Sequence, residues 1–343
     1  MRRLMFVLSG EHRTLSAAEA MAGIRAEHRA VKLLEQLDQV LVVETQAEPE
    51  SLASRLAMSK EICYHICTSG NSEKEIFETV GSSDIVDLIP HGKTFAVRVK
   101  RIKRSAPATD TIALSKKLAK AIAEEIDFKV DLMHPEIEFL GVLTGEKCAF
   151  GITAARVDRG QFTKRRPTSR PAFHPSTLKP ILARCMVNLA RTPRGGKFLD
   201  PFCGVGGILI EAGFVGSNLI GLDIEPDRIE GARKNLEAEG ITDFQLMVGD
   251  ARKLSAMEVD TIVTDPPYGR QSTTGGTELE NLYRKSLPSL TGVLKRKGYL
   301  CITSPAELNI NEVAEEAGLH AIENHEQRVH RSLTRQIRVF KKK

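Results

Sequence analysis

The second half of the chain alternates short apolar runs with longer segments in which apolar residues recur every three or four positions. The first pattern predicts buried strands, and the second predicts amphipathic helices. Their alternation is typical of a parallel sheet covered by helices. Strands are expected at 197–199, 219–222, 245–248, 261–264 and 299–303, and helices at 176–190, 208–213, 227–240, 279–294 and 307–317. Two further extended segments, 321–329 and 336–340, predict a terminal hairpin that adds one antiparallel strand and completes a seven-stranded, mostly parallel sheet.

The first half predicts two smaller α/β units. In the first, strands are expected at 4–9 and 40–43, with a helix that begins at Ser16, where Glu19 completes a capping box, and a short helix at 50–58. The second is expected to contain a strand around Tyr64, a helix around 76–80, a strand with alternating basic residues at 94–104, a helix at 111–126 with Ile112, Leu118 and Ile122 inward, a strand at 129–133, and a hairpin of 135–143 and 147–152.

These patterns divide the chain into four segments. Residues 1–57 form an N-terminal domain, and residues 58–155 form a second small domain. Residues 156–172 are a basic linker, which two prolines make semi-stiff. Residues 173–343 hold the strand–helix alternation. The fold class is therefore α/β throughout.

The composition narrows the class of protein without naming it. The 343 residues are 41% hydrophobic, with a net charge of +5. No apolar run approaches the roughly 18 residues of a membrane span, and the N-terminus lacks a cleavage signature, so we expect a cytoplasmic protein without a membrane partner. The cysteines are scattered; the single cluster, Cys63 and Cys67 around His65, is apolar, so buried thiols are expected there and no metal.

Four acids follow four successive strands of the second half: Asp200, Asp223, Asp250 and Asp265. In an open parallel sheet, ligands bind beyond the carboxyl ends of the strands. One acid at each of these ends is the most specific signal in the sequence, and it predicts a ligand site along this edge.

The first turn of this edge combines Asp200 with Gly204, Gly206 and Gly207. Glycines let the backbone approach a ligand closely, but dinucleotide enzymes share that feature. Here Asp200 would repel a pyrophosphate, and it favours a cationic group such as an amine or a sulfonium. Asp223 can accept hydrogen bonds from ribose hydroxyls. Asp250 can accept one from an adenine amine, with Ile224 and Ala251 beside the ring.

The last acid opens the sequence Asp265-Pro266-Pro267-Tyr268-Gly269. Two prolines cannot continue a strand ladder, so we expect a stiff loop at the strand end. Such a loop, with a carboxylate beside an exposed aromatic ring, suits the grip of a flat base by its face and its exocyclic amine. An ordinary turn with a buried tyrosine is the alternative.

Together these residues resemble the class I S-adenosylmethionine-dependent methyltransferases, which implies a Rossmann-like fold and S-adenosylmethionine as cofactor. Residues 200–207 are similar to their first motif, and residues 265–268 to their amino-methylating motif. His174-Pro175 and the basic 94–104 strand are similar to THUMP-containing tRNA guanine-N2-methyltransferases, which have an N-terminal ferredoxin-like domain. The resemblance implies that Asp265, Pro266, Pro267 and Tyr268 are catalytic, and that the cofactor is bound by His174, Asp200, Phe202, Cys203, Gly204, Gly206, Asp223, Ile224, Asp250 and Ala251.

The resemblance implies methylation of N2 of a guanosine in tRNA. The Asp-Pro-Pro-Tyr-Gly form favours the archaeal guanosine-10 branch, whose members also dimethylate. The alternatives are guanosine 6, ribosomal RNA, or a non-catalytic RNA-binding or assembly factor. A DNA adenine-N6 methyltransferase and a nicotinamide dehydrogenase are disfavoured, the second by Asp200. No protein partner is implied, and a monomer would suffice.

Basic residues predict where RNA would lie. Arg98, Lys100, Arg101 and Arg104, with Lys164, Arg165 and Arg166 of the linker, are expected to follow phosphates, although a solvated basic face is an equal alternative for each. Few aromatic residues accompany them, so recognition of RNA shape is expected. The segment 331–335 joins the last two strands, where it either approaches the substrate or forms a simple loop.

Overall fold

Strand pairing divides the chain into two units in this computed structural model. The structure describes residues 1–27, 30–83, 85, 93–125, 129–255, 257–268, 275–330 and 333–343. The first unit comprises Met1–Ala20, His28–Ser54 and Met58–Asp158, and the second comprises Met21–Glu27, Arg55–Ala57 and Arg159–Lys343. Gly269, Arg331 and Ser332, which figure in the sequence analysis, lie outside the described residues.

The first unit is built on one eight-stranded mixed sheet in the order β2-β3-β1-β4-β8-β7-β5-β6. Strands β4 and β8 are long and antiparallel, and they join strands from both predicted N-terminal domains into this sheet. Strand β5 runs parallel to both of its neighbours, β6 and β7. The strands are β1 (Arg2–Leu8), β2 (Val31–Leu37), β3 (Val40–Thr45), β4 (Ser59–Gly70), β5 (Thr94–Arg101), β6 (Lys129–Val130), β7 (Ile137–Thr144) and β8 (Lys147–Arg156).

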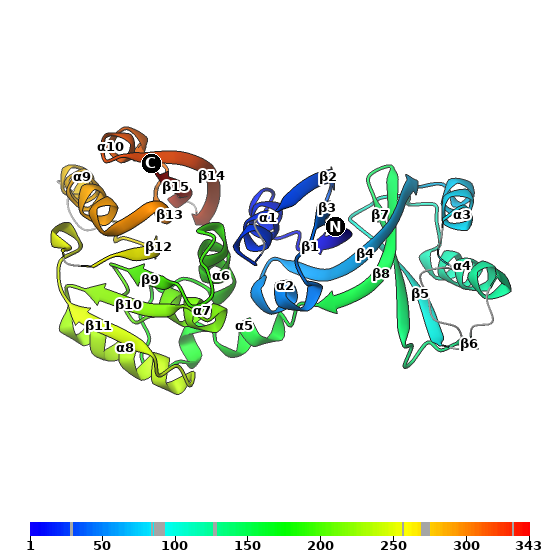
Figure 1. Cartoon of the computed structure of the whole chain (residues 1–343), viewed down its shortest axis with the longest axis horizontal. Coiled ribbons are helices and arrows are strands. Elements are labelled where there is room, and N and C mark those ends of the chain that lie inside the picture. Colours follow the sequence, from blue (N-terminus) through cyan, green and yellow to red (C-terminus); the bar gives the residue numbers. More distant parts are fainter. Residues whose placement is uncertain are drawn as a thin grey trace. The chain divides into compact units, whose positions relative to one another are not determined.

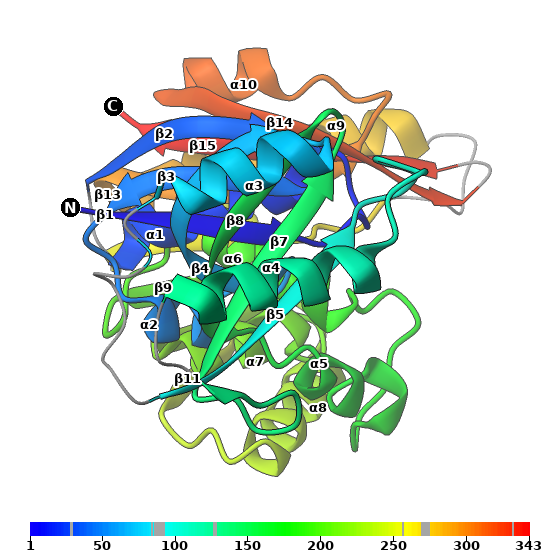
Figure 2. The same cartoon turned by 90° about the vertical axis from the view of Figure 1, so that its right-hand side faces the viewer.

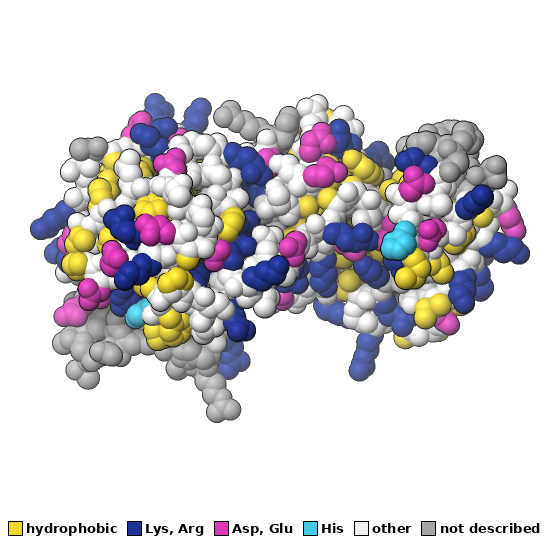
Figure 3. All heavy atoms as spheres, turned by 90° about the horizontal axis from the view of Figure 1, so that it is seen from below, with side chains coloured by type: hydrophobic (Ala, Val, Ile, Leu, Met, Phe, Trp, Pro, Cys, Tyr) yellow, Lys and Arg dark blue, Asp and Glu magenta, His cyan; other side chains and the backbone are white. Residues whose placement is uncertain are grey.

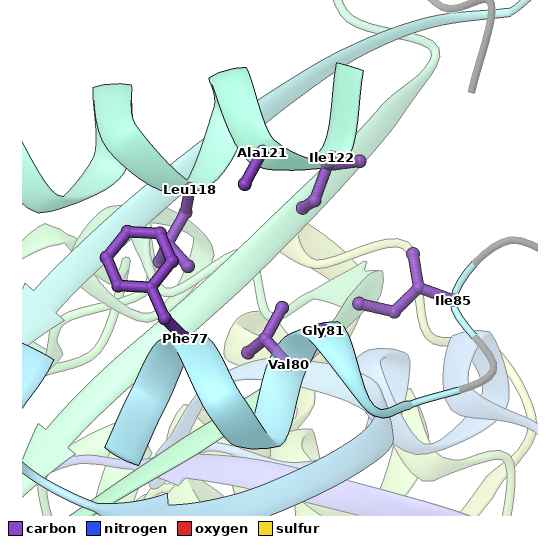
Figure 4. A pocket seen from close by; sticks show the side chains of 7 residues that line it. All are labelled: Phe77, Val80, Gly81, Ile85, Leu118, Ala121 and Ile122. Carbon is purple, nitrogen blue, oxygen red and sulfur yellow. The ribbon is translucent and has the colours of Figure 1, made fainter. Parts of the chain in front are cut away.

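Helices α3 (Glu73–Gly81) and α4 (Thr111–Glu125) lie side by side on one face of this sheet, where α3 contacts β4 and α4 contacts β5 and β6 (Figures 1 and 2). Phe95, Phe139 and Phe150 pack beneath them, with ring centroids 5.9 and 5.8 Å apart. A gap of about 30 Å³ remains between the two helices; Figure 4 shows its lining of hydrocarbon side chains. Because no polar group lines it with a side chain, we interpret it as a packing gap.

Several N-terminal predictions are corrected by the structure. Helix α1 (Leu15–Glu27) already contains Ser16, so the capping box is wrong. His12 Nδ1 accepts from the first backbone N–H groups instead, and Glu19 accepts from Met58 N. Ile112 was expected inward but is 68% exposed, whereas Leu118 and Ile122 are buried as predicted. The strand expected at 129–133 ends at Val130. Strand β2 was missed, and helix α2 is Pro49–Arg55.

The second unit holds the predicted seven-stranded sheet, in the order β11-β10-β9-β12-β13-β15-β14. The first five strands in this order, from β11 to β13, pair in parallel with their neighbours. Strand β15 runs antiparallel between β13 and β14, as the terminal hairpin predicted. The strands are β9 (Lys197–Asp200), β10 (Asn218–Asp223), β11 (Phe244–Val248), β12 (Val259–Thr264), β13 (Leu294–Pro305), β14 (Leu319–His330) and β15 (Leu333–Lys342).

Helices cover both faces of this sheet (Figure 1). Helix α7 contacts both α6 and α8 on one face, and α9 contacts α10 on the other. The helices are α6 (Pro180–Leu189), α7 (Gly207–Val215), α8 (Pro226–Ala238), α9 (Gly275–Val293) and α10 (Asn311–Glu316). Helix α6 begins four residues later than predicted because Pro180 occupies its first turn, and it is buried on nearly every side.

The predicted linker is partly ordered into short elements. It contains helix α5 (Gly160–Lys164) and a 3₁₀ turn at Pro167–Ser169. None of the helices in the described part of the chain is both long and apolar enough to span a membrane.

Candidate active site

The sheet order places the four acids in a row along one edge. Strands β11, β10, β9 and β12 are neighbours, so their carboxyl ends present Asp250, Asp223, Asp200 and Asp265 in that spatial order. The two central acids end their strands, and the two outer acids follow theirs. The edge predicted from the sequence is therefore one continuous surface of the second unit.

Asp200 is the most buried of these carboxylates, with 1% of its surface exposed. It accepts hydrogen bonds from Thr264 Oγ1 at 2.7 Å and from Phe202 N at 3.2 Å. Burial, together with the charges of Asp223 and Asp265, raises the pKa of Asp200 to about 7, against the hydrogen bonds that lower it. A cation beside this carboxylate would favour its ionised form, so the site is suited to a positively charged ligand group.

The glycine loop turns sharply between β9 and α7. Gly204 and Gly206 have φ values of 50° and 82°, which side chains other than glycine rarely adopt. A Cβ on Gly206 would lie 3.2 Å from Ala232, whereas one on Gly204 would meet open space. Gly204 N donates to Asp223 Oδ2 at 2.9 Å, which ties the loop to the next strand end. The Cys203 side chain is buried and close to Gly221, and its Sγ donates to Gly204 O at 3.6 Å within the loop.

Two exposed apolar side chains lie at the ends of β10 and β11. Asp223 and Val248 are paired in register, and Ile224 follows Asp223. Ile224 and Val248 are 61% and 55% exposed, which leaves two large apolar side chains at the edge of the sheet. Together with the hydroxyl-accepting Asp223, they offer what an adenosine needs: a face for the ring and a carboxylate for the ribose.

Asp250 follows the end of β11, two residues after Val248. Its carboxylate accepts from Arg252 Nη2 at 2.7 Å and from Arg252 N at 2.9 Å. The Arg252 side chain is the main reason that the pKa of Asp250 falls to about 2. An adenine amine would have to share this carboxylate with Arg252. Ala251, which was predicted beside the ring, is buried at the start of the 3₁₀ turn Ala251–Lys253.

His174 is half-buried, and Asp223 is among the charged residues close to it. Its Nδ1 shares a hydrogen bond with Ser176 Oγ at 2.7 Å. Partial burial, followed by the charge of Arg228, lowers the pKa of His174, and Glu225 and Asp223 oppose that shift. These charges place His174 close to Asp223; the binding of the cofactor by His174 stays a prediction.

These features fit S-adenosylmethionine by the chemistry of the groups present. The buried carboxylate of Asp200 suits a cationic group of the ligand, and the open space at Gly204 lets a ligand come close to the backbone. The exposed side chains of Ile224 and Val248 offer apolar contact to a base. Among the described residues, no three His, Cys, Asp or Glu side chains gather as they would around a metal ion.

The loop after β12 meets two residues that sequence reasoning did not assign to the site. Tyr268 donates its hydroxyl to Asp265 Oδ1 at 2.5 Å, and Thr303 Oγ1 donates to the same oxygen. Arg335 Nη2 lies 3.8 Å from Asp265 Oδ2. Pro266 is buried and Pro267 exposed. Tyr268 was expected to be exposed; it is half-buried, because its hydroxyl is turned toward the carboxylate.

A signal was present in the sequence for both residues: Thr303 ends a predicted strand, and Arg335 belongs to the segment 331–335, which was expected either to approach the substrate or to form a simple loop. Thr303 is the polar residue near the end of the strand beside β12, where Thr264 pairs with Ile302. Arg335 reaches Asp265 only because β15 pairs with β13 in a register that sets Arg335 opposite Pro305. Hydrophobic patterns do not determine the register of an antiparallel pair on their own.

The basic residues predicted to contact RNA divide into four groups. Arg98 and Lys100 are exposed but paired with Glu138 and Glu61, at 2.7 and 2.8 Å. Arg101 is half-buried and donates to Thr109 O. Arg104, Lys164 and Arg166 are exposed as well, and Arg165 is the fourth case. Figure 3 shows Lys and Arg side chains spread over this face of each unit with Asp and Glu between them.

Arg165 requires a correction, because its side chain is buried. It is 6% exposed and donates through Nε and Nη2 to Glu211 at 3.1 and 3.0 Å. Its guanidinium also lies over the Phe214 ring. A phosphate cannot reach it in this arrangement, so Arg165 serves packing within the second unit.

Comparison with known proteins agrees with this geometry. Residues 167–337 match the family described as RMKL-like, methyltransferase domain, and residues 70–153 match the THUMP domain. The chain is 36% identical over 342 residues to the tRNA (guanine(10)-N2)-dimethyltransferase of Methanothermobacter thermautotrophicus, covering 99% of both chains. It is 36% identical to the Pyrococcus abyssi protein of the same name, covering 93% of this chain and 94% of the relative.

A solved structure shows the same fold at low sequence identity. TrmN from Thermus thermophilus superposes with a TM-score of 0.54 at 19% identity, covering 99% of this chain and 100% of that one. The full-length matches at 36% identity carry the family assignment. The chain therefore belongs to the THUMP-containing, S-adenosylmethionine-dependent RNA methyltransferases, in the family of the archaeal tRNA (guanine(10)-N2)-dimethyltransferases.

Proposed function

We propose that this protein transfers methyl groups from S-adenosylmethionine to N2 of guanosine 10 in tRNA, giving N2-methylguanosine and then N2,N2-dimethylguanosine. The observation that carries the proposal is the position of Asp265. It stands at the carboxyl edge beside Asp200, to which Thr264 links it, in a loop that suits an exocyclic amine. The full-length likeness to the guanosine-10 enzymes favours this position over guanosine 6 or ribosomal RNA.

The chemical difficulty lies in the acceptor amine. The lone pair of a guanine amine is delocalised into the ring, so it must localise on nitrogen as the methyl group arrives. S-adenosylmethionine supplies that methyl group already activated on a sulfonium. The Asp265 carboxylate and the Pro266 carbonyl are two acceptors that draw the amine hydrogens out of the ring plane. Asp265 then takes the proton after attack, when the nitrogen has become acidic.

Positioning supplies much of the remaining barrier reduction. Thr303 and Arg335 hold the two oxygens of Asp265 from neighbouring strands, so the carboxylate is oriented before the base arrives. The Tyr268 ring stacks on the base once its hydroxyl leaves Asp265, and base stacking typically contributes about 1–3 kcal/mol.

The tRNA would be held by exposed basic residues of both units. Arg104, Lys164 and Arg166 are exposed, although Arg166 Nε donates to Ser169 Oγ at 3.0 Å, and Arg98 and Lys100 can exchange a glutamate for a phosphate. Such contacts position the substrate and make binding salt-dependent. A cytoplasmic location and action as a monomer complete the proposal.

The test is methyl transfer from tritiated S-adenosylmethionine to unmodified tRNA, ribosomal RNA and DNA, followed by nucleoside analysis and mapping of the modified position. We expect N2-methylated guanosine at position 10 of tRNA. Asp265→Ala should abolish transfer and leave cofactor affinity, measured by calorimetry, within about threefold of the wild type. Methylation of another guanosine or of ribosomal RNA would replace the proposal. Absence of transfer to every acceptor would favour a non-catalytic RNA-binding role.

A further inference from the structure

Arg335 faces Asp265, and the proposed methyl transfer requires nothing further of it. It comes from β15 and is 7% exposed. Its Nη2 is 3.8 Å from Asp265 Oδ2, and its Cζ is 5.3 Å from the centroid of the Tyr268 ring. The two residues that grip the base therefore both touch this guanidinium.

The hydrogen-bonding capacity of Arg335 is not met within the described residues. Its Nε is buried without a partner there, and the approach to Asp265 is longer than a hydrogen bond. The Nε of Arg338, three residues along the same strand, is also buried without a partner there, but its Nη1 donates to Ser304 Oγ at 2.6 Å and to Leu308 O at 3.3 Å, whereas no hydrogen bond from the Arg335 side chain is found among the described residues. Leaving a buried donor unsatisfied is costly, so an acceptor supplied by the substrate is the natural partner.

The chemistry of guanine supplies that acceptor at the right edge. Its 2-amino group and its O6 flank N1 on the same edge of the ring. When the amine lies against the Asp265 carboxylate, O6 faces the neighbouring group, and Arg335 is that neighbour. A guanidinium only donates hydrogen bonds, so it suits O6 and opposes a purine with an amine at the same carbon.

We propose that Arg335 reads O6 of the target base and thereby restricts transfer to guanine. The proposal rests on the proposed function, because it assumes that the acceptor is a guanine amine. A phosphate is the other acceptor that an arginine commonly binds. It fits less well here, because a phosphate within reach of Arg335 would also meet the negative charge of Asp265.

The experiment compares two tRNA transcripts that differ in one base. One carries guanosine at position 10, and the other carries 2,6-diaminopurine, which keeps the 2-amino group and replaces O6 with an amine. Both compete in the same reaction with tRNA in excess over the enzyme, so the product ratio at low conversion gives the ratio of kcat/KM values. The proteins are the wild type, Arg335→Met, Arg335→Gln and, as a matched control, Arg338→Met, which removes a buried arginine of the same strand.

The wild type should prefer guanosine, and Arg335→Met should lower that preference at least tenfold, in the range of one specific base contact. Arg335→Gln should lower it further, because its amide oxygen can accept from the 6-amino group. Arg338→Met should keep the wild-type preference. Cofactor affinity by calorimetry shows that each variant retains its fold.

An unchanged preference in both Arg335 variants overturns the proposal, whatever their overall rates, since a phosphate contact or a role on Asp265 alone would slow both substrates equally. A wild-type protein that methylates both transcripts equally overturns it without any variant. A wild-type protein that leaves the guanosine transcript unmodified would instead refute the proposed function.

Discussion

Glu211 in helix α7 offers a sharp test of how the second unit is held together. It is fully buried, and it accepts from Arg165 Nε and Nη2 at 3.1 and 3.0 Å. Arg184 Nη2 lies 3.0 Å from Oε2 of the same carboxylate, although it is not aligned for a hydrogen bond. One carboxylate thus compensates two buried guanidinium groups.

The perturbation is Glu211→Gln, which keeps the shape of the side chain and removes its charge. Two buried cations would then lack their counter-charge. Removing one partner of a buried ion pair typically costs about 3–5 kcal/mol. Stacking of Arg165 on the Phe214 ring, at 4.3 Å, remains in the variant and offsets only part of this loss. For a unit of this size, each kcal/mol lowers Tm by about 2–4 °C, so a fall of roughly 6–20 °C is expected.

The matched control is Glu230→Gln in helix α8. Glu230 also faces two basic side chains, Arg233 at 3.7 Å and Lys234 at 3.6 Å, but it is 56% exposed. Exposed pairs contribute at most about 1 kcal/mol, so this variant should melt within a few degrees of the wild type. Calorimetric melting of all three proteins at one pH and salt concentration gives the comparison. Equal Tm shifts in the two variants would refute the reasoning that burial, and not the number of charges, sets the cost.

Two further predictions concern charge at the edge and in the linker. Because the pKa of Asp200 is raised to about 7, the folded protein holds one proton more than the unfolded chain between about pH 4 and pH 7, and its unfolding free energy falls across that window. Asp200→Asn should remove this fall, so that the variant gains stability over the wild type up to about pH 7 and no further; a difference that does not vary with pH would contradict the burial argument. In the linker, Arg166→Gln should weaken tRNA binding and reduce the salt dependence of its affinity by about one phosphate contact, whereas Arg165→Gln should lower Tm without changing that salt dependence. Fluorescence titrations over a salt series measure the salt dependence of tRNA affinity for both variants, and thermal melting measures Tm. A reduced slope for Arg165→Gln would show that its side chain does reach the RNA.

The edge of the second sheet could be predicted because its signal is local. Each of the strands β9, β10, β11 and β12 is a short apolar run that ends at or just before an acid, so the residues of the edge follow from sequence position alone. The parallel topology then brings Asp200 and Asp265 together without any knowledge of side-chain packing. The same logic located Thr303 near a strand end, although it gave Thr303 no role.

The remainder depends on contacts between distant segments. Arg335 joins the site through the register of β15 against β13, and Arg165 leaves the RNA surface because Glu211, 46 residues later, is buried beside it. The local hydrophobic pattern indicates neither the register of β15 against β13 nor the burial of Arg165. Ser16 shows the opposite failure: the local capping pattern is present, but α1 begins one residue earlier and its first N–H groups bind His12.

Three carboxylates on one edge acquire different properties from their surroundings. Asp250 is held ionised by Arg252, Asp200 is pushed toward the neutral form by burial, and Asp265 is oriented by a hydroxyl and a guanidinium. A cationic cofactor would favour ionised Asp200, so it should bind more tightly as pH rises through about 7 and should release a proton on binding below that value. The negative charge that this proton leaves on Asp200 then lies close to Asp265, because Thr264, the residue before Asp265, donates a hydrogen bond to Asp200. Asp200 and Asp265 are thereby placed in one electrostatic neighbourhood, so the ionisation of one carboxylate bears on the other.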